Sequence, residues 1–201
     1  MKKIILAAAA VFTFGFANAQ TEKGNWQISG STGLGFNSFT QKYKADNGQT
    51  QDGLKTSSFN IKPAVGYFVI DNLMIGLAMD YNTTTSKERT FKFTNNAISM
   101  IPQATYYFGK TNVKPFLNAG LGFATASIKE SSNDFSDSSS ASGMAWGLNG
   151  GVAYFVTKTI SFDFGIGYQS ISLKFDESNN SQSVKSITSG LVSQVGISVY
   201  F

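Results

Sequence analysis

Residues 186–201 read SITSGLVSQVGISVYF, and their side chains alternate between two kinds. One set is largely apolar and ends on an aromatic ring; it includes Ile187, Leu191, Val195, Ile197, Val199 and Phe201. The set between them is mostly small or polar and includes Thr188, Gly190, Gln194, Gly196 and Ser198. Because successive side chains of a β-strand point to opposite faces, this period of two predicts a strand with one apolar face. The segment is long enough to cross a bilayer, since a tilted spanning strand needs ~9–11 residues.

The same alternation recurs along the whole chain. It predicts eight strands, over residues 25–37, 58–69, 73–83, 97–108, 113–127, 144–156, 160–173 and 187–201. Their connections alternate between long polar loops at 38–57, 84–96, 128–143 and 174–186 and tight turns at 70–72, 109–112 and 157–159. An even number of strands with short turns at one end is typical of membrane barrels. The sequence therefore predicts an all-β fold: a closed antiparallel eight-stranded transmembrane β-barrel in an up-and-down meander.

Alternation alone does not say which face points inward. The apolar face carries no charge, whereas the other face is rich in Ser, Asn, Gly and Gln and holds the few charges of the strand interiors. A solvated outer surface would normally carry abundant mixed charge, so the polar face is interpreted as a narrow lumen. We predict a lumen network of Lys62, Asp80, Asp163, Gln103, Asn118, Asn149 and Gln194, in which the charges neutralise each other.

Large aromatic residues gather toward the strand ends on the apolar face, as expected for girdles at two membrane interfaces. Those near the tight turns include Trp26, Tyr67, Tyr106, Tyr154 and Phe201, and those near the long loops include Trp146 and Tyr168.

The N-terminus reads as a secretory signal. Lys2 and Lys3 precede an apolar run from Ile4 to Ala17, and Ala17-Asn18-Ala19 is a small-x-small cleavage site. The run is shorter than the ~20 residues of a spanning helix. We expect residues 1–19 to be a signal peptide and residues 20–201 to be the barrel domain. The formal net charge of +4 is small and the basic residues are scattered in sequence, so we expect no nucleic-acid partner.

Three features together resemble a known family: the signal peptide with eight strands, the turn Gly66-Tyr67-Phe68-Val69-Ile70-Asp71-Asn72-Leu73, and the terminal Tyr200-Phe201. They are similar to the small OmpX/OmpA-type barrels of the porin and outer-membrane β-barrel domain family. The resemblance implies a location in the Gram-negative outer membrane, contact with outer-membrane lipid and lipopolysaccharide, and assembly by machinery that reads Phe201. We expect a monomer.

The chain contains no histidine and no cysteine, so the usual nucleophile and base pairs cannot be built. Asp80 and Asp163 are interpreted as lumen residues, and we predict no catalytic, cofactor-binding or metal-binding residue. The leading hypothesis is a non-enzymatic scaffold for surface loops, with a role in envelope structure or adhesion. The alternatives are a narrow channel for ions or small solutes and a soluble periplasmic lipid-binding barrel. Basic loop residues such as Lys87, Arg89 and Lys92 suggest contact with lipopolysaccharide phosphates.

Overall fold

The structure is a computed structural model, and it describes residues 21–44, 50–88, 91–132, 136–175 and 184–201. The side chains of 32–44, 50–54, 88, 136, 175 and 184 lie outside this description. The predicted signal peptide and Arg89 also fall outside it, so both remain predictions. Among the described residues, no helix is long and apolar enough to cross a membrane.

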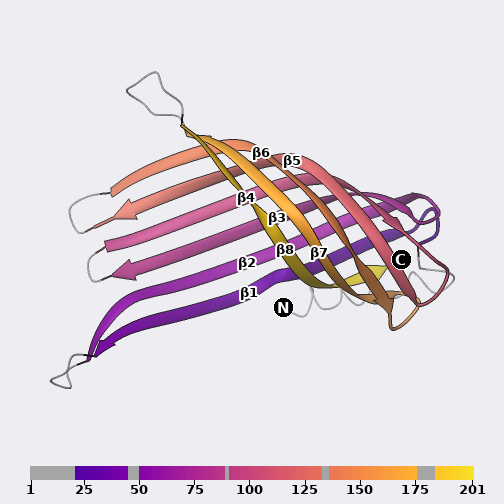
Figure 1. Cartoon of the computed structure of the whole chain (residues 1–201), viewed down its shortest axis with the longest axis horizontal. Coiled ribbons are helices and arrows are strands. Elements are labelled where there is room, and N and C mark those ends of the chain that lie inside the picture. The colour runs from indigo at the N-terminus through magenta and orange to yellow at the C-terminus, as the bar shows by residue number, and fades with distance from the viewer. Residues whose placement is uncertain (1–20, 45–49, 89–90, 133–135, 176–183) are drawn as a thin grey trace, which may run out of the picture.

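All eight predicted strands are present (Figure 1). They are β1 (Trp26–Lys44), β2 (Thr50–Ile70), β3 (Leu73–Glu88), β4 (Phe91–Tyr107), β5 (Val113–Ser131), β6 (Ser136–Phe155), β7 (Ile160–Phe175) and β8 (Val184–Tyr200). Each strand pairs antiparallel with its neighbours in chain order, and β1 pairs with β8 to close the barrel. This confirms the predicted closed meander.

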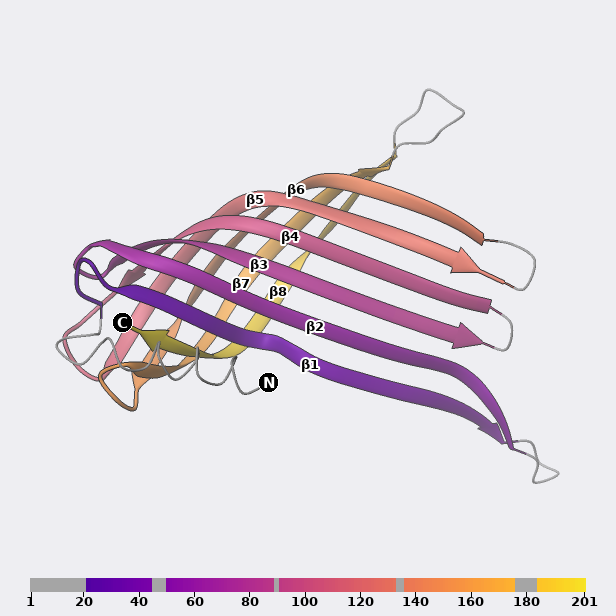
Figure 2. The ribbon, with the colours of Figure 1, turned by 180° about the vertical axis from the view of Figure 1, so that it is seen from behind.

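The closure is confined to one end of the barrel, which we call the short-turn end because the tight turns lie there. The β1–β8 ladder runs from Gln27↔Tyr200 to Ser31↔Gly196. Beyond it, at the hairpin end, the ends of β1 and β8 lie apart while β1 to β6 run on together (Figures 1 and 2). The β5–β6 ladder, by contrast, continues without a shift from Val113↔Tyr154 to Ser131↔Ser136. The sheet is therefore a closed cylinder at one end, and at the other it is an open sheet whose described strands stay paired except between β1 and β8.

The apolar face points outward. Leu191 is 78% exposed and Phe123 is 72% exposed, whereas Phe68 and Tyr200 on the opposite face are 0% exposed. The inner face encloses a cavity lined mainly by polar and small side chains. The alternative of a soluble barrel with its apolar face inward is therefore wrong. An outer surface this apolar would be unfavourable in water, whereas contact with lipid carries no such free-energy cost.

The predicted loops were too long. Much of 38–57, 84–96, 128–143 and 174–186 is strand, and the strands end within a few residues of the hairpin tips. The apolar alternation fades there because the outward residues become polar like the inward ones. Backbone pairing does not need that alternation, and Ser-rich and Thr-rich segments still extend the ladder.

Two inward-facing glycines leave space in the lumen for large side chains. A Cβ at Gly66 would lie 2.6 Å from Met74 Cγ, and a Cβ at Gly151 would lie 2.6 Å from Phe116 Cζ and closer still to the carbonyl oxygen of Phe164. These glycines allow large side chains to cross the lumen. Gly190 on β8 has no atom within 4 Å of the corresponding position.

We therefore expect Gly151→Ala to destabilise the folded barrel by about 1–3 kcal/mol through overpacking. The matched control, Gly190→Ala, should be neutral or slightly stabilising, because alanine restricts the unfolded chain and meets no neighbour. Urea unfolding of detergent-refolded protein, followed by tryptophan fluorescence, measures both. Equal midpoints for the two variants would contradict this account of the interior.

Candidate functional site: the lumen and its floor

The lumen holds a cavity of about 330 Å³. All seven residues of the predicted lumen network line it: Lys62, Asp80, Gln103, Asn118, Asn149, Asp163 and Gln194. They come from seven strands, β2 to β8, and each has the parity opposite to the outward apolar residues of its strand. The cavity is thus surrounded by hydrogen-bonding groups that the barrel wall shields from the apolar exterior.

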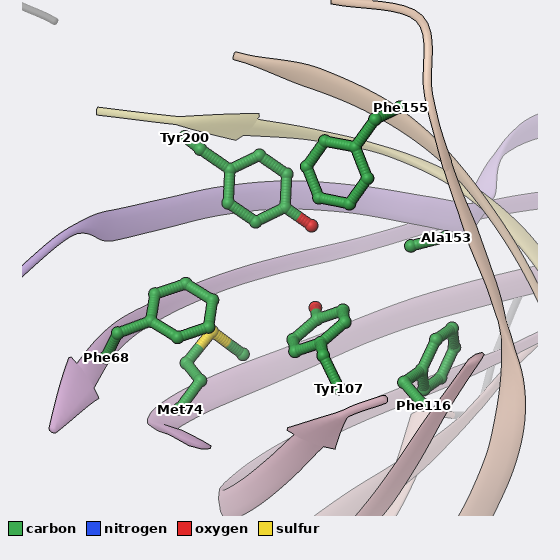
Figure 3. Packing of buried hydrophobic residues seen from close by; sticks show 7 residues of the cluster. All are labelled: Phe68, Met74, Tyr107, Phe116, Ala153, Phe155 and Tyr200. Carbon is green, nitrogen blue, oxygen red and sulfur yellow. The ribbon is translucent and has the colours of Figure 1, made fainter. Parts of the chain in front are cut away.

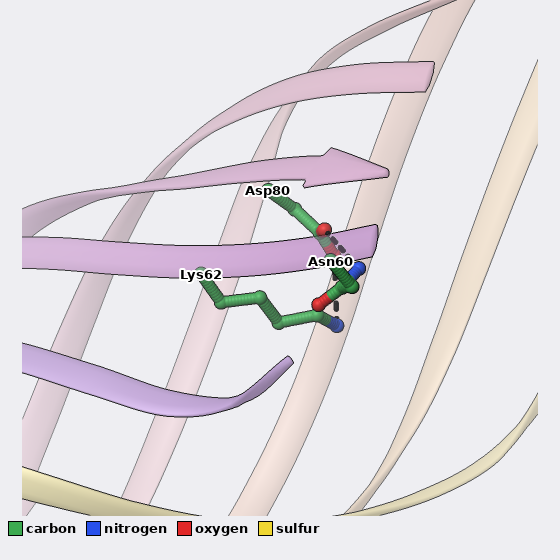
Figure 4. Close-up of polar contacts among 3 residues, drawn as sticks. All are labelled: Asn60, Lys62 and Asp80. Carbon is green, nitrogen blue, oxygen red and sulfur yellow. Dashed lines mark hydrogen bonds and ion pairs between the residues drawn. The ribbon is translucent and has the colours of Figure 1, made fainter. Parts of the chain in front are cut away.

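One ion pair crosses from β2 to β3. Lys62 Nζ lies 2.7 Å from Asp80 Oδ2, and Asn60 Nδ2 donates to Asp80 Oδ1 at 3.1 Å (Figure 4). Both charged side chains are partly exposed, at 34% and 26%. The pair holds two opposite charges within the lumen, where an isolated charge would be more costly.

An amide ladder continues the network across β4, β5 and β6. Asn118 Nδ2 lies 3.1 Å from Gln103 Oε1 and 2.8 Å from Thr105 Oγ1, and Asn149 Nδ2 donates to Asn118 Oδ1 at 3.2 Å. These groups satisfy one another between strands, which fixes the inner surface.

Asp163 does not join the Lys62–Asp80 pair, so the predicted mutual neutralisation of three charges is only partial. Its carboxylate instead accepts hydrogen bonds from the hydroxyls of Ser161, at 2.7 Å, and Ser198. The Gln27 amide nitrogen lies 2.9–3.1 Å from the hydroxyls of Ser198, Tyr107 and Tyr200. Hydroxyl donors therefore solvate this carboxylate, at the foot of the cavity.

Below this network an aromatic plug fills the short-turn end (Figure 3). Its buried members are Phe68, Met74, Tyr107, Phe116, Ala153, Phe155 and Tyr200. The ring centroids of Phe155 and Tyr200 lie 5.0 Å apart, and those of Phe68 and Tyr107 lie 5.8 Å apart. Aromatic rings at such distances pack favourably and exclude water.

The chain before β1 covers the plug from below. Thr21 is 2% exposed, its hydroxyl accepts from Lys114 Nζ at 2.6 Å, and its carbonyl accepts from the backbone N–H of Asn72 at 2.6 Å. Gly24 N donates to the Phe68 carbonyl at 2.9 Å, which fastens the segment to β2. The lumen is therefore closed at this end by side chains and by backbone.

The sequence reasoning missed this plug, although a signal for it exists. β2, β4 and β6 approach the short-turn end with the aromatic doublets Tyr67-Phe68, Tyr106-Tyr107 and Tyr154-Phe155, and Tyr200 at the end of β8 is followed by Phe201. Neighbours in a strand face opposite sides, so each doublet supplies one ring to the outside and one to the interior. Tyr154 is 50% exposed and Phe155 is 3% exposed.

The predicted girdle residues lie on the outward face. Trp26, Tyr67, Tyr106, Trp146, Tyr154 and Tyr168 are each at least 36% exposed. Phe201 is half-buried and exchanges two backbone hydrogen bonds with Trp26, at 2.6 and 3.0 Å, so the two residues meet at the β1–β8 seam. An interfacial aromatic belt would place its rings on this outward face, and the belt itself stays a prediction.

Residues 4–201 match a protein family described as "Outer membrane protein beta-barrel domain". A comparison with curated proteins finds no matching relative.

Several solved structures resemble the chain. The attachment invasion locus protein Ail of Yersinia pestis, in complex with the heparin analogue sucrose octasulfate, is 17% identical; the match covers 89% of this chain and 99% of that one, with a TM-score of 0.53. Neisserial surface protein A is 23% identical over 92% of this chain and 100% of that one, with a TM-score of 0.47. The N-terminal β-barrel domain of Pseudomonas aeruginosa OprF is 14% identical over 89% and 98%, with a TM-score of 0.48. The likeness to Ail supports the same fold.

Because the plug closes the lumen, we expect the refolded protein to give no discrete conductance steps in planar lipid bilayers. Phe68→Ala combined with Phe155→Ala should produce brief openings, since two of the sealing rings are removed. The neighbouring pair Tyr67→Ala and Tyr154→Ala alters the outward ring of the same doublets and should stay silent. Regular conductance steps from the unaltered protein, changed by Lys62→Ala, would contradict a sealed lumen and support a narrow channel.

Proposed function

This chain belongs to the outer membrane protein beta-barrel domain family, and from that premise we propose that it is a non-enzymatic scaffold whose hairpins meet the cell's surroundings. The barrel anchors the protein in the outer membrane, and the hairpin end projects outward. The role that this arrangement fits best is in adhesion or in the structure of the envelope.

The observation that carries the proposal is the contrast between the two ends of the barrel. The short-turn end is sealed by the aromatic plug, whereas the strands at the hairpin end continue as paired ladders past the outward apolar residues. In β5–β6 the pairs near the hairpin tip, such as Ile128↔Ser139 and Lys129↔Ser138, remain in register. A hydrogen-bonded hairpin holds its side chains in fixed positions, which a flexible loop does not.

The hairpins also expose aromatic surface. Phe91 is 57% exposed and Phe93 is 43% exposed, both on β4 beyond the apolar belt. Aromatic side chains are frequent anchors at protein interfaces because they bury a large area with little loss of conformational entropy. The attachment invasion locus protein Ail, a barrel of the same fold, is also named for attachment.

We propose no chemistry for the lumen. The chain contains no histidine and no cysteine. Asp163 is held by hydroxyl groups, and Asp80 is held by Lys62 and Asn60, so both carboxylates have structural partners. A narrow channel is the second candidate, because the cavity is polar, but the plug counts against it.

We also propose that export depends on residues 1–19 and that cleavage after Ala19 leaves Gln20 as the first residue of the mature protein. The buried Thr21 supports this boundary, because the folded barrel uses the chain from that position onward. The intact mass of protein extracted from outer membranes checks it. A mass that includes residues 1–19 would contradict the proposal.

The functional test is a deletion strain complemented with variants on the hairpin end. The unaltered gene should restore surface attachment, and Phe91→Ser with Phe93→Ser should lower it severalfold by removing the exposed rings. Thr94→Ser with Asn95→Ser on the same strand is the matched control and should behave like the unaltered protein. A shift in gel mobility on heating verifies that each barrel is folded.

A deletion strain with unchanged attachment, envelope integrity and detergent sensitivity would overturn the scaffold proposal.

A further inference from the structure

We infer that six lysines at the hairpin end form a binding surface for the phosphate groups of a phosphorylated glycolipid in the surrounding outer leaflet. We call this surface the lysine rim; its members are Lys55, Lys87, Lys92, Lys129, Lys174 and Lys185. The inference rests on one element of the proposed function, which is that the hairpin end lies on the outer side of the membrane.

Strand register places these lysines, which are scattered in the sequence, in two neighbouring groups along the rim, one on β2 to β5 and one on β7 and β8. Lys87 on β3 lies directly opposite Lys55 on β2 and Lys92 on β4. Lys174 on β7 lies directly opposite Lys185 on β8. Directly opposed residues have Cβ atoms ~4.5–5.5 Å apart and share a face of the sheet.

That shared face is the one that meets lipid lower in the barrel. On β3 the parity of Lys87 is that of Leu77, and on β5 the parity of Lys129 is that of Phe123, both of which are exposed outward. The ladders between β2 and β8 keep a constant register along this length, so the parity is maintained up to the rim. All six lysines are exposed. Their ammonium groups therefore face sideways from the barrel wall.

The surface just below the rim suggests a sugar-bearing headgroup. Between the apolar belt and the rim the outward residues are mostly hydroxyl-bearing, among them Thr83, Thr85, Thr125, Ser127, Ser170 and Ser172. From Phe123 to Lys129 the strand advances about 20 Å, or about 15 Å along the membrane normal for a ~40° tilt. Phospholipid headgroups occupy only ~5–8 Å per leaflet. Hydroxyl groups followed by lysines match a taller headgroup whose sugars carry phosphates.

The positive charges of the lysine rim favour the binding of an anion. Like charges directly opposite on neighbouring strands destabilise a sheet. Among the described side chains, none of the six lysines has a carboxylate within 4.0 Å, and the nearby acids Glu130 and Asp137 lie opposite each other on the inner-facing side. A phosphate placed between two such lysines would offset their repulsion and accept charge-assisted hydrogen bonds from both.

Lipid retention tests the assignment. The barrel is refolded into phosphatidylcholine vesicles that contain lipopolysaccharide, extracted in mild detergent, and assayed for lipopolysaccharide per protein. We expect Lys55→Gln, Lys87→Gln and Lys92→Gln together to lower retention about tenfold. The triple arginine variant at these positions should retain as much as the unaltered protein, since the charge is kept.

The matched control is the triple variant Lys23→Gln, Lys110→Gln and Lys158→Gln, which removes the same charge from exposed positions at the short-turn end and should retain lipid normally. Dephosphorylated lipopolysaccharide should be retained only at the level of the rim variant.

Two results would overturn the inference. They are equal retention by the rim variant and the unaltered protein, or equal retention of the phosphorylated and dephosphorylated lipid. The heat-dependent gel shift distinguishes a failure of the lysine-rim inference from a failure of the proposed scaffold function. A protein that never becomes heat-modifiable contradicts the membrane scaffold, whereas a heat-modifiable barrel with unchanged retention contradicts only the lysine rim.

Discussion

Every backbone N–H and C=O inside a bilayer must find a partner within the protein, because lipid offers none. This barrel pairs each strand with the next, and a short ladder between residues 27–31 of β1 and 196–200 of β8 closes the sheet. Closure also gives the sheet an inside and an outside, and the two-residue period then assigns every side chain to one of them. This assignment of each side chain to the inner or outer face, repeated along the barrel axis, produces the apolar exterior, the polar lumen, the plug and the lysine rim.

The two ends of the barrel differ in the residue types that the strands place on the inner and outer faces. At the short-turn end, aromatic doublets place rings on both faces, so that Tyr154 faces outward while Phe155 seals the interior. At the hairpin end, lysines face outward while Glu130 and Asp137 face the other way. The protein thus separates a sealed anchoring region from a polar region that is free to contact other molecules.

The sequence alone was enough to predict the strand number, the order of the strands and the outward face. The alternation of apolar and polar residues, bounded by tight turns such as Asp71-Asn72, is a local pattern that can be read without knowledge of the tertiary structure. The positions of the predicted lumen residues followed from parity in the same way. The strand ends at the hairpin side could not be predicted, because polar residues on both faces carry no periodic signal. The register between strands could not be predicted either, because the sequence does not say which residues face each other across two strands. The position of Lys87 directly opposite Lys55 and Lys92 depends on that register.

The assignment of faces can be tested at two neighbouring positions on β8. Leu191 is 78% exposed on the outside, and Val192 lines the cavity. The chain has no cysteine, so Leu191→Cys and Val192→Cys each give a single labelling site for an environment-sensitive fluorophore. In vesicles with spin-labelled lipid tails, fluorescence should be strongly quenched at position 191 and nearly unaffected at position 192. Equal quenching at both positions, or stronger quenching at 192, would contradict the account.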